Sequence, residues 1–94
     1  MTKAHLLYHA DRIALPLRLL QQRFGNEQWD EAADAIIEQL NIIRPNKSIA
    51  VAFDVDTSHS NPWFHSMAVT ITGATPAELT QLTTWLHQQA LLEQ

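Results

Sequence analysis

The chain has 94 residues, of which 46% are hydrophobic and 17% are charged, a composition typical of one folded domain, residues 1–94, and not of a disordered segment. Its net charge of −4, with six scattered basic residues, argues against a positively charged surface that could bind nucleic acid. Cysteine is absent, which excludes disulfides and thiol chemistry, and no apolar run approaches the roughly 18 residues of a membrane span. We therefore expect a cytoplasmic protein that binds neither nucleic acid nor membrane.

The N-terminal quarter of the chain is predicted to be helical. Hydrophobic residues recur in steps of three and four from Leu6 to Phe24, which is typical of one face of a helix. Pro16 lies inside this pattern and lacks a backbone donor, so we expect a kink or two short helices that meet near Leu15. Gly25 suits the end of the segment.

A second helix is predicted between Asn26, whose side-chain oxygen can cap a helix, and Pro45, which ends it. Its apolar stripe consists of Trp29, Ala33, Ile36, Leu40 and Ile43. The short break between the two helices predicts an antiparallel pair that shares an apolar seam.

Two β-strands are predicted next, because the hydrophobic period changes to two. The first covers residues 49–55, and the second begins at Trp63 and continues to Thr72. The sequence TSHSNP between them is typical of a turn.

The two strands form an antiparallel hairpin if each core-facing residue stands opposite another core-facing residue. One register that meets this condition pairs Phe53 with Met67 and Val55 with His65. In that register the aspartates of the first strand point to the outward face of the hairpin.

The sequence TPAE predicts the start of a last helix, because Thr75 can cap it, Pro76 suits its first position and Glu78 can bond back to the cap. The helix continues nearly to the C-terminus. The predicted fold class is therefore α+β, in the order helix-helix-strand-strand-helix, with an antiparallel β-hairpin packed on one face by two or three helices.

The segment VTITGATPAELTQLTTWLHQQ, residues 69–89, resembles the strand and helix that end the small DNA-damage-inducible inhibitors that bind the RecA recombinase. The resemblance implies a small α/β protein that acts by protein contact. It covers about a fifth of the chain. The chain departs from that family because it opens with a helical pattern where the family has a strand, and because its last helix is not strongly acidic.

Two groups of residues are candidates for a metal site. Asp54, Asp56 and His59 could combine two carboxylates with an imidazole, a ligand set suited to zinc, manganese or iron. His5 and His9 are four residues apart and would share a helical face, but no third ligand is apparent. In the alternative interpretation, Asp56 caps the turn and the histidines are solvated surface residues.

Two features favour a protein-binding surface. Pro62 introduces Trp63 and Phe64, which alternation sends to opposite faces of the sheet, so that Trp63 can close the core while Phe64 has no predicted burial. Exposed aromatic residues are typical anchors of interfaces. The alternative is that Phe64 packs on a helix of the same chain.

The outward face of the hairpin is small and flat, because Ala50, Ala52 and Ala68 lie on it. A two-stranded sheet is marginal unless it is extended or covered. We therefore expect a partner element or a second copy in a homodimer at this face, or else a helix of the same chain.

No nucleophile with a neighbouring base and no phosphate-binding glycine loop is present. The sequence thus favours a small non-enzymatic, regulatory protein-interaction module without a cofactor, whose partner is another protein. The alternative function is a metal-binding or small-ligand-binding domain that uses the carboxylates and histidines named above.

Overall fold

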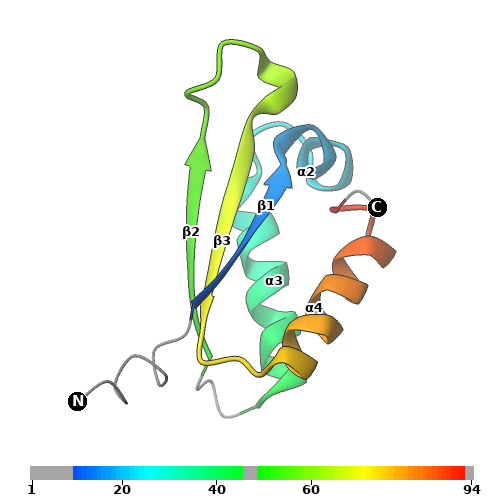
Figure 1. Ribbon diagram of the computed structural model, residues 1–94. Coiled ribbons are helices and arrows are strands. Elements are labelled where there is room, and N and C mark those ends of the chain that lie inside the picture. The colour runs from blue at the N-terminus through cyan, green and yellow to red at the C-terminus, as the bar shows by residue number, and fades with distance from the viewer. Residues whose placement is uncertain (1–9, 46–48, 93–94) are drawn as a thin grey trace, which may run out of the picture.

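The computed structural model describes residues 10–45 and 49–92, and within them three antiparallel strands pack on one side against three helices (Figure 1). In chain order the elements are β1 (Ala10–Pro16), α2 (Leu17–Phe24), α3 (Trp29–Ile43), β2 (Ala50–Asp56), the 3-10 helix η1 (Pro62–Phe64), β3 (Ser66–Thr72) and α4 (Pro76–Gln88). The predicted α+β class is confirmed, with an extra strand at the start of the described chain.

The extra strand, β1, occupies residues for which the sequence predicted a helix. It pairs antiparallel with β3, so that Ile13 stands opposite Val69 and Leu15 opposite Met67. The helical prediction is therefore wrong for residues 10–16, and the helix begins only after Pro16. Ile13 and Leu15 also fit a period of two, and burial on β3 decides between the two patterns.

The junction between α2 and α3 is a tight backbone turn. Gly25 has a φ of 106°, which favours glycine, and its N–H donates to the carbonyl of Gln21 at 2.8 Å. The predicted stop at Gly25 is thus confirmed. The predicted cap at Asn26 is wrong, because α3 begins at Trp29 and Gln28 occupies the cap position.

The sheet has the order β1-β3-β2, with β3 in the centre. The hairpin register differs from the predicted one by two residues, since Phe53 stands opposite Val69 and Val55 opposite Met67. A shift of two keeps every side chain on its predicted face, so hydrophobic alternation alone could not choose between the registers. The choice is made by η1, which takes residues 62–64 out of the strand and moves the start of β3 to Ser66.

The core lies between the inner face of the sheet and the helices (Figure 1). Its fully buried side chains include Leu15, Leu20, Ile36, Met67, Val69, Ile71, Leu82, Leu86 and Leu91. In the part of the chain that the structure describes, all three helices lie on this side of the sheet. None of the described helices is long and apolar enough to cross a membrane.

The start of α4 is held by a capping box, as predicted. The Glu78 N–H donates to the Thr75 hydroxyl at 3.2 Å, and the Thr75 N–H donates to the Glu78 carboxylate at 2.8 Å. Arg44, at the end of α3, donates through Nε to the same carboxylate at 2.8 Å and through a second nitrogen to its other oxygen. The side-chain hydrogen bond from Arg44 is the largest cause of the lowered pKa of Glu78.

Candidate protein-binding surface at the hairpin tip

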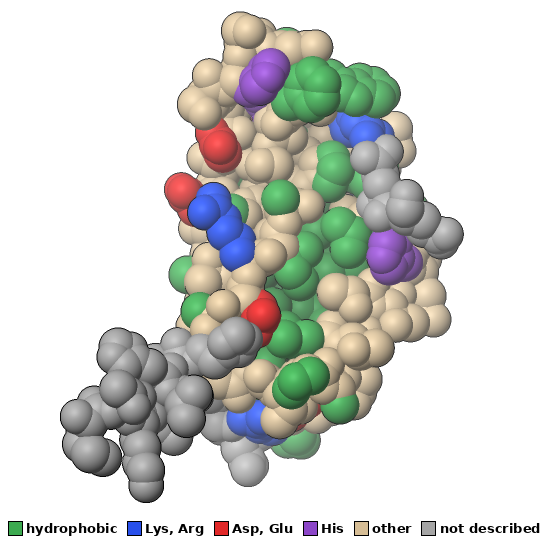
Figure 2. Space-filling model, viewed as in Figure 1, with side chains coloured by type: hydrophobic (Ala, Val, Ile, Leu, Met, Phe, Trp, Pro, Cys, Tyr) green, Lys and Arg blue, Asp and Glu red, His purple; other side chains and the backbone are tan. Residues whose placement is uncertain are grey.

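The tip of the hairpin carries two exposed aromatic side chains. Trp63 and Phe64 belong to η1 and are 60% and 59% exposed. Figure 2 shows hydrophobic side chains gathered at this end of the molecule, next to a histidine. We call Trp63 and Phe64 the aromatic tip.

The backbone of the aromatic tip is held by hydrogen bonds from its own sequence. The Asn61 side-chain oxygen accepts from the Trp63 N–H at 3.0 Å, and the Asn61 carbonyl accepts from the Phe64 N–H at 3.0 Å. The Pro62 carbonyl accepts from the His65 N–H at 3.1 Å. Since Pro62 also has a fixed φ, the chain presents both aromatics on a defined turn.

The loop that leads to the tip is built in the same way. One Asp56 oxygen accepts from the Ser58 N–H at 3.0 Å and from the Ser58 hydroxyl at 2.6 Å. These bonds, the hydroxyl first, lower the pKa of Asp56. The Asn61 N–H donates to Nδ1 of His59 at 3.0 Å, so the loop uses its polar side chains to satisfy its own backbone.

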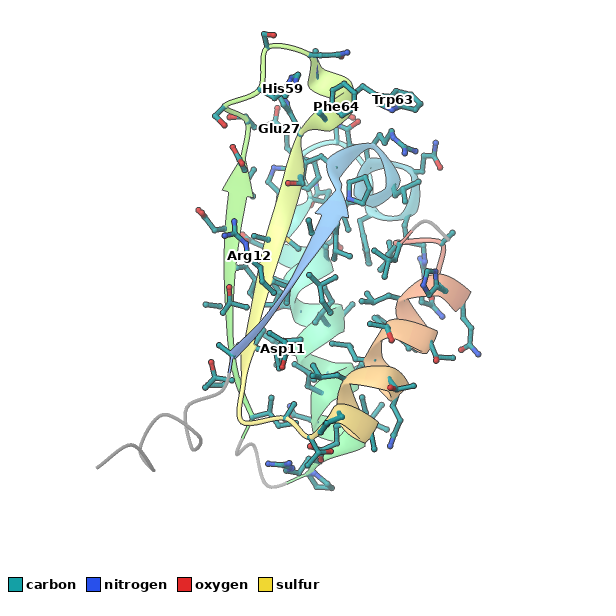
Figure 3. The ribbon with its side chains drawn as sticks, in the orientation of Figure 1. Asp11, Arg12, Glu27, His59, Trp63 and Phe64 are labelled. Carbon is teal, nitrogen blue, oxygen red and sulfur yellow. The ribbon has the colours of Figure 1, made fainter. Side chains whose placement is uncertain are left out.

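His59 contacts both His65 and Phe64 at the end of the hairpin. His65 donates from Nε2 to the carbonyl of His59 at 2.7 Å. The His59 ring lies 4.8 Å from the Phe64 ring, with 47° between the planes. In Figure 3, Phe64 lies between His59 and Trp63. The His59 and Phe64 rings are therefore in contact at the tip of the hairpin.

Helix α2 contacts the aromatic tip and the residue that follows it. The Arg18 guanidinium lies 4.1 Å from the centre of the Trp63 ring, a cation–π contact, and the Leu17 N–H donates to the His65 carbonyl at 2.9 Å. Beside the aromatic tip is a hollow of about 270 Å³, lined by Ala14, Pro16, Arg18, Trp63, Phe64, His65 and Ser66. This hollow is large enough for one or two side chains of a partner.

The structure changes the predicted role of Trp63. It does not close the core, because η1 precedes β3 and lies outside the sheet. The indole instead packs against Arg18 of α2. The prediction that Phe64 is exposed is confirmed, and no described helix covers it. Sequence reasoning missed Arg18, because its contact with Trp63 joins residues far apart in the chain.

The predicted flat face of the hairpin is only partly open. Ala50 and Ala52 are exposed, as expected, whereas Ala68 is 3% exposed because it lies between Ala14 of β1 and Asp54 of β2. Ala68 therefore offers little surface to a partner. The alternative that a helix covers this face is not realised by any described helix.

The candidate metal ligands are not brought together. Asp54 and Asp56 lie on the outer face of β2, and His59 is turned toward Asn61 and Phe64. Among the described residues, no three histidine or carboxylate side chains are close enough to hold a metal ion. The pair His5 and His9 lies outside the described residues.

None of the family models, curated proteins or solved structures compared with the chain matches it. Residues 10–16, which the sequence predicted to be helical, form the strand β1, and residues 1–9 lie outside the described part of the chain. The resemblance in residues 69–89 covers only a turn, a strand and a helix, and it assigns no family.

Proposed function

We propose that this chain is a small non-enzymatic regulatory module that binds another protein through the aromatic tip. The observation that carries the proposal is the exposure of two adjacent large aromatics, 60% and 59%, on a turn whose backbone is held by hydrogen bonds. Large aromatics dominate the binding energy of many interfaces. A turn that is already ordered loses little conformational entropy on binding. Less of the free energy of its contacts with a partner is therefore spent on ordering the chain.

The chemistry around the tip fits a partner side chain with an apolar body. The hollow beside Trp63 and Phe64 combines aromatic faces with the Arg18 guanidinium and the His65 ring at its rim. An apolar anchor can be buried against the rings while its polar end reaches the rim. The proposal therefore predicts one dominant anchor on the partner.

The test is an affinity capture from the native host's lysate, read by mass spectrometry, with the wild type, Phe64→Ala and Ile42→Ala. Ile42 is the matched control, because it is an apolar residue 66% exposed near the end of α3. We expect a partner that is captured by the wild type and by Ile42→Ala and is lost with Phe64→Ala. With the purified partner, Phe64→Ala should weaken binding on the order of 30-fold.

Two results would contradict the proposal. Equal capture of the partner by the wild type and a folded Phe64→Ala variant would place the binding surface elsewhere. If none of the three proteins captured a partner, the proposed protein-binding function would be abandoned.

A further inference from the structure

The two edges of the sheet are not equally protected. β1 and β2 are the outer strands, and an outer strand presents unpaired backbone donors and acceptors that can pair with another chain. β1 carries two features that discourage such pairing. Pro16 lacks an amide hydrogen, and Asp11 places a charge on the inner face, opposite Ile71 (Figure 3).

The edge of β2 lacks these features along its first half. Residues 50–53 contain no charge, no proline and no glycine, and β3 is the only described strand that pairs with β2. In the described part of the chain, the other edge of β2 is therefore available to an added strand.

An apolar groove accompanies this edge. A hollow of about 170 Å³ lies between α3 and β2 and is lined by Ile37, Leu40, Asn41, Ile49 and Val51. Ile37, at its rim, is 38% exposed. In an added strand, every second side chain would point to the helix side of the sheet and toward this groove. Main-chain pairing with side-chain insertion is a common mode of peptide recognition.

The charges of β2 specify the other face of the added strand. Asp54 and Asp56 point away from the helices at the carboxyl end of β2, while Val51 and Phe53 point toward the helix side. A segment that pairs along the whole edge therefore needs aliphatic residues on the groove side. Opposite the two aspartates it needs Lys or Arg, because opposite charges across paired strands are favourable.

From these features we infer that the free edge of β2 is a strand-addition site for an extended basic segment of another protein, with aliphatic side chains at alternate positions. This surface is separate from the aromatic tip, and the inference does not rest on the proposed function. It concerns main-chain pairing, whereas the tip acts through its aromatic side chains.

The probe is an acetylated and amidated heptapeptide, Lys-Val-Lys-Val-Thr-Val-Thr, designed to pair antiparallel with β2. Two control peptides separate the contributions. One has N-methyl groups on the amides that face β2, and the other has Glu in place of both Lys residues. Binding to the full chain is followed by amide chemical shifts and hydrogen exchange in NMR spectra.

We expect saturable shifts concentrated along β2, and slower exchange of the β2 amides that do not pair with β3. The N-methylated peptide should not bind, and the Glu peptide should bind at least about tenfold more weakly. The variant Ile37→Lys should weaken binding about tenfold by placing a charge at the rim of the groove. Its matched control, Ile42→Lys, is on the same helix but does not line the groove and should bind normally.

Several outcomes would overturn the inference. These are the absence of saturable shifts at millimolar peptide, equal binding of the N-methylated peptide, or equal effects of the two isoleucine variants. Slow exchange of all β2 amides before peptide is added would mean that the edge is already paired, for example with a second copy. Phe64→Ala should bind the peptide unchanged, so failure at the tip and failure at the edge are distinguishable.

Discussion

Glu78 takes part in several interactions at the start of α4. It closes the capping box with Thr75 and accepts two hydrogen bonds from Arg44, so it joins the start of α4 to the end of α3. The bonds to its charged form lower its pKa below the usual value of 4.5. Thr75, Pro76 and Glu78 were recognised from the sequence, whereas the partner Arg44 was not, because it lies 34 residues away.

The lowered pKa of Glu78 makes its contribution to stability depend on pH. The ionised form is favoured in the folded state, so the stabilisation is fully present above the unfolded pKa and is lost as the pH falls through the folded one. Glu78→Gln keeps the capping geometry and removes the charge. We expect this variant to have a lower Tm than the wild type at pH 7. The difference in Tm between the two proteins should become smaller below pH 4.5 and disappear at lower pH.

Thermal unfolding across pH 2.5 to 7, at intervals of about half a unit, measures this difference. Asp56 also has a lowered pKa, so both proteins should share some further loss of stability in acid. Glu38→Gln, at an exposed position of α3, is the control and should follow the wild type. A Glu78→Gln deficit that stays constant with pH would contradict the assignment.

At the scale of elements, β1 is where local pattern and tertiary structure disagree. Residues 10–16 satisfy a helical spacing and also an alternating one, and Pro16 is compatible with the end of a strand or the start of a helix. The strand forms because β3 supplies backbone partners and because Leu15 becomes fully buried among core residues. Such long-range burial outweighs a weak local preference.

Substitutions at adjacent positions of β1 test its alternation. Leu15→Ala should lower the free energy of unfolding by about 2–5 kcal/mol, because it leaves a cavity in the core. Ala14→Ser, at the exposed neighbouring position, should change it by less than about 0.5 kcal/mol. Urea denaturation measures both values. Similar effects at the two positions would argue against the strand.

At the scale of the whole molecule, the described helices cover one face of the sheet (Figure 1), and the other face carries small and polar side chains. The open face has Arg12 on β1, labelled in Figure 3, and Asp54 and Asp56 on β2. Arg12 already contributes to the lowered pKa of Asp56 in its own chain. In a two-fold arrangement, two such mixed-charge faces would lie against each other, so that Arg12 could also meet an aspartate of the second copy. The homodimer expected from the sequence stays a prediction.

We expect sedimentation equilibrium at micromolar concentrations to give twice the mass of the chain. Thr70→Glu would place an added charge at the centre of the open face, where Thr70 stands opposite Arg12 and Ala52, and should yield the monomer with an unchanged circular dichroism spectrum. Ile42→Lys, at the end of α3, should remain dimeric. A wild-type monomer at every concentration would contradict this prediction.

The sequence by itself determined the features that depend on neighbouring residues. These are Ile36 and Leu40 in the apolar stripe of α3, the stop at Gly25, the capping box at Thr75, the two strands of the hairpin and the faces of their side chains. For the candidate site, it identified Phe64 as a residue without burial, whereas it placed Trp63 and Phe64 in a strand and not in η1. Each of these follows from spacing or turn chemistry over a few residues.

Only the tertiary structure decided that residues 10–16 are a strand, that the hairpin register is two residues from the predicted one, and that Trp63 lies outside the core over Arg18. The reason is physical. A helix stripe and an alternating strand can share the same hydrophobic residues, and a two-residue shift preserves every face. The choice therefore depends on burial and backbone pairing between segments distant in the chain, which no local pattern encodes.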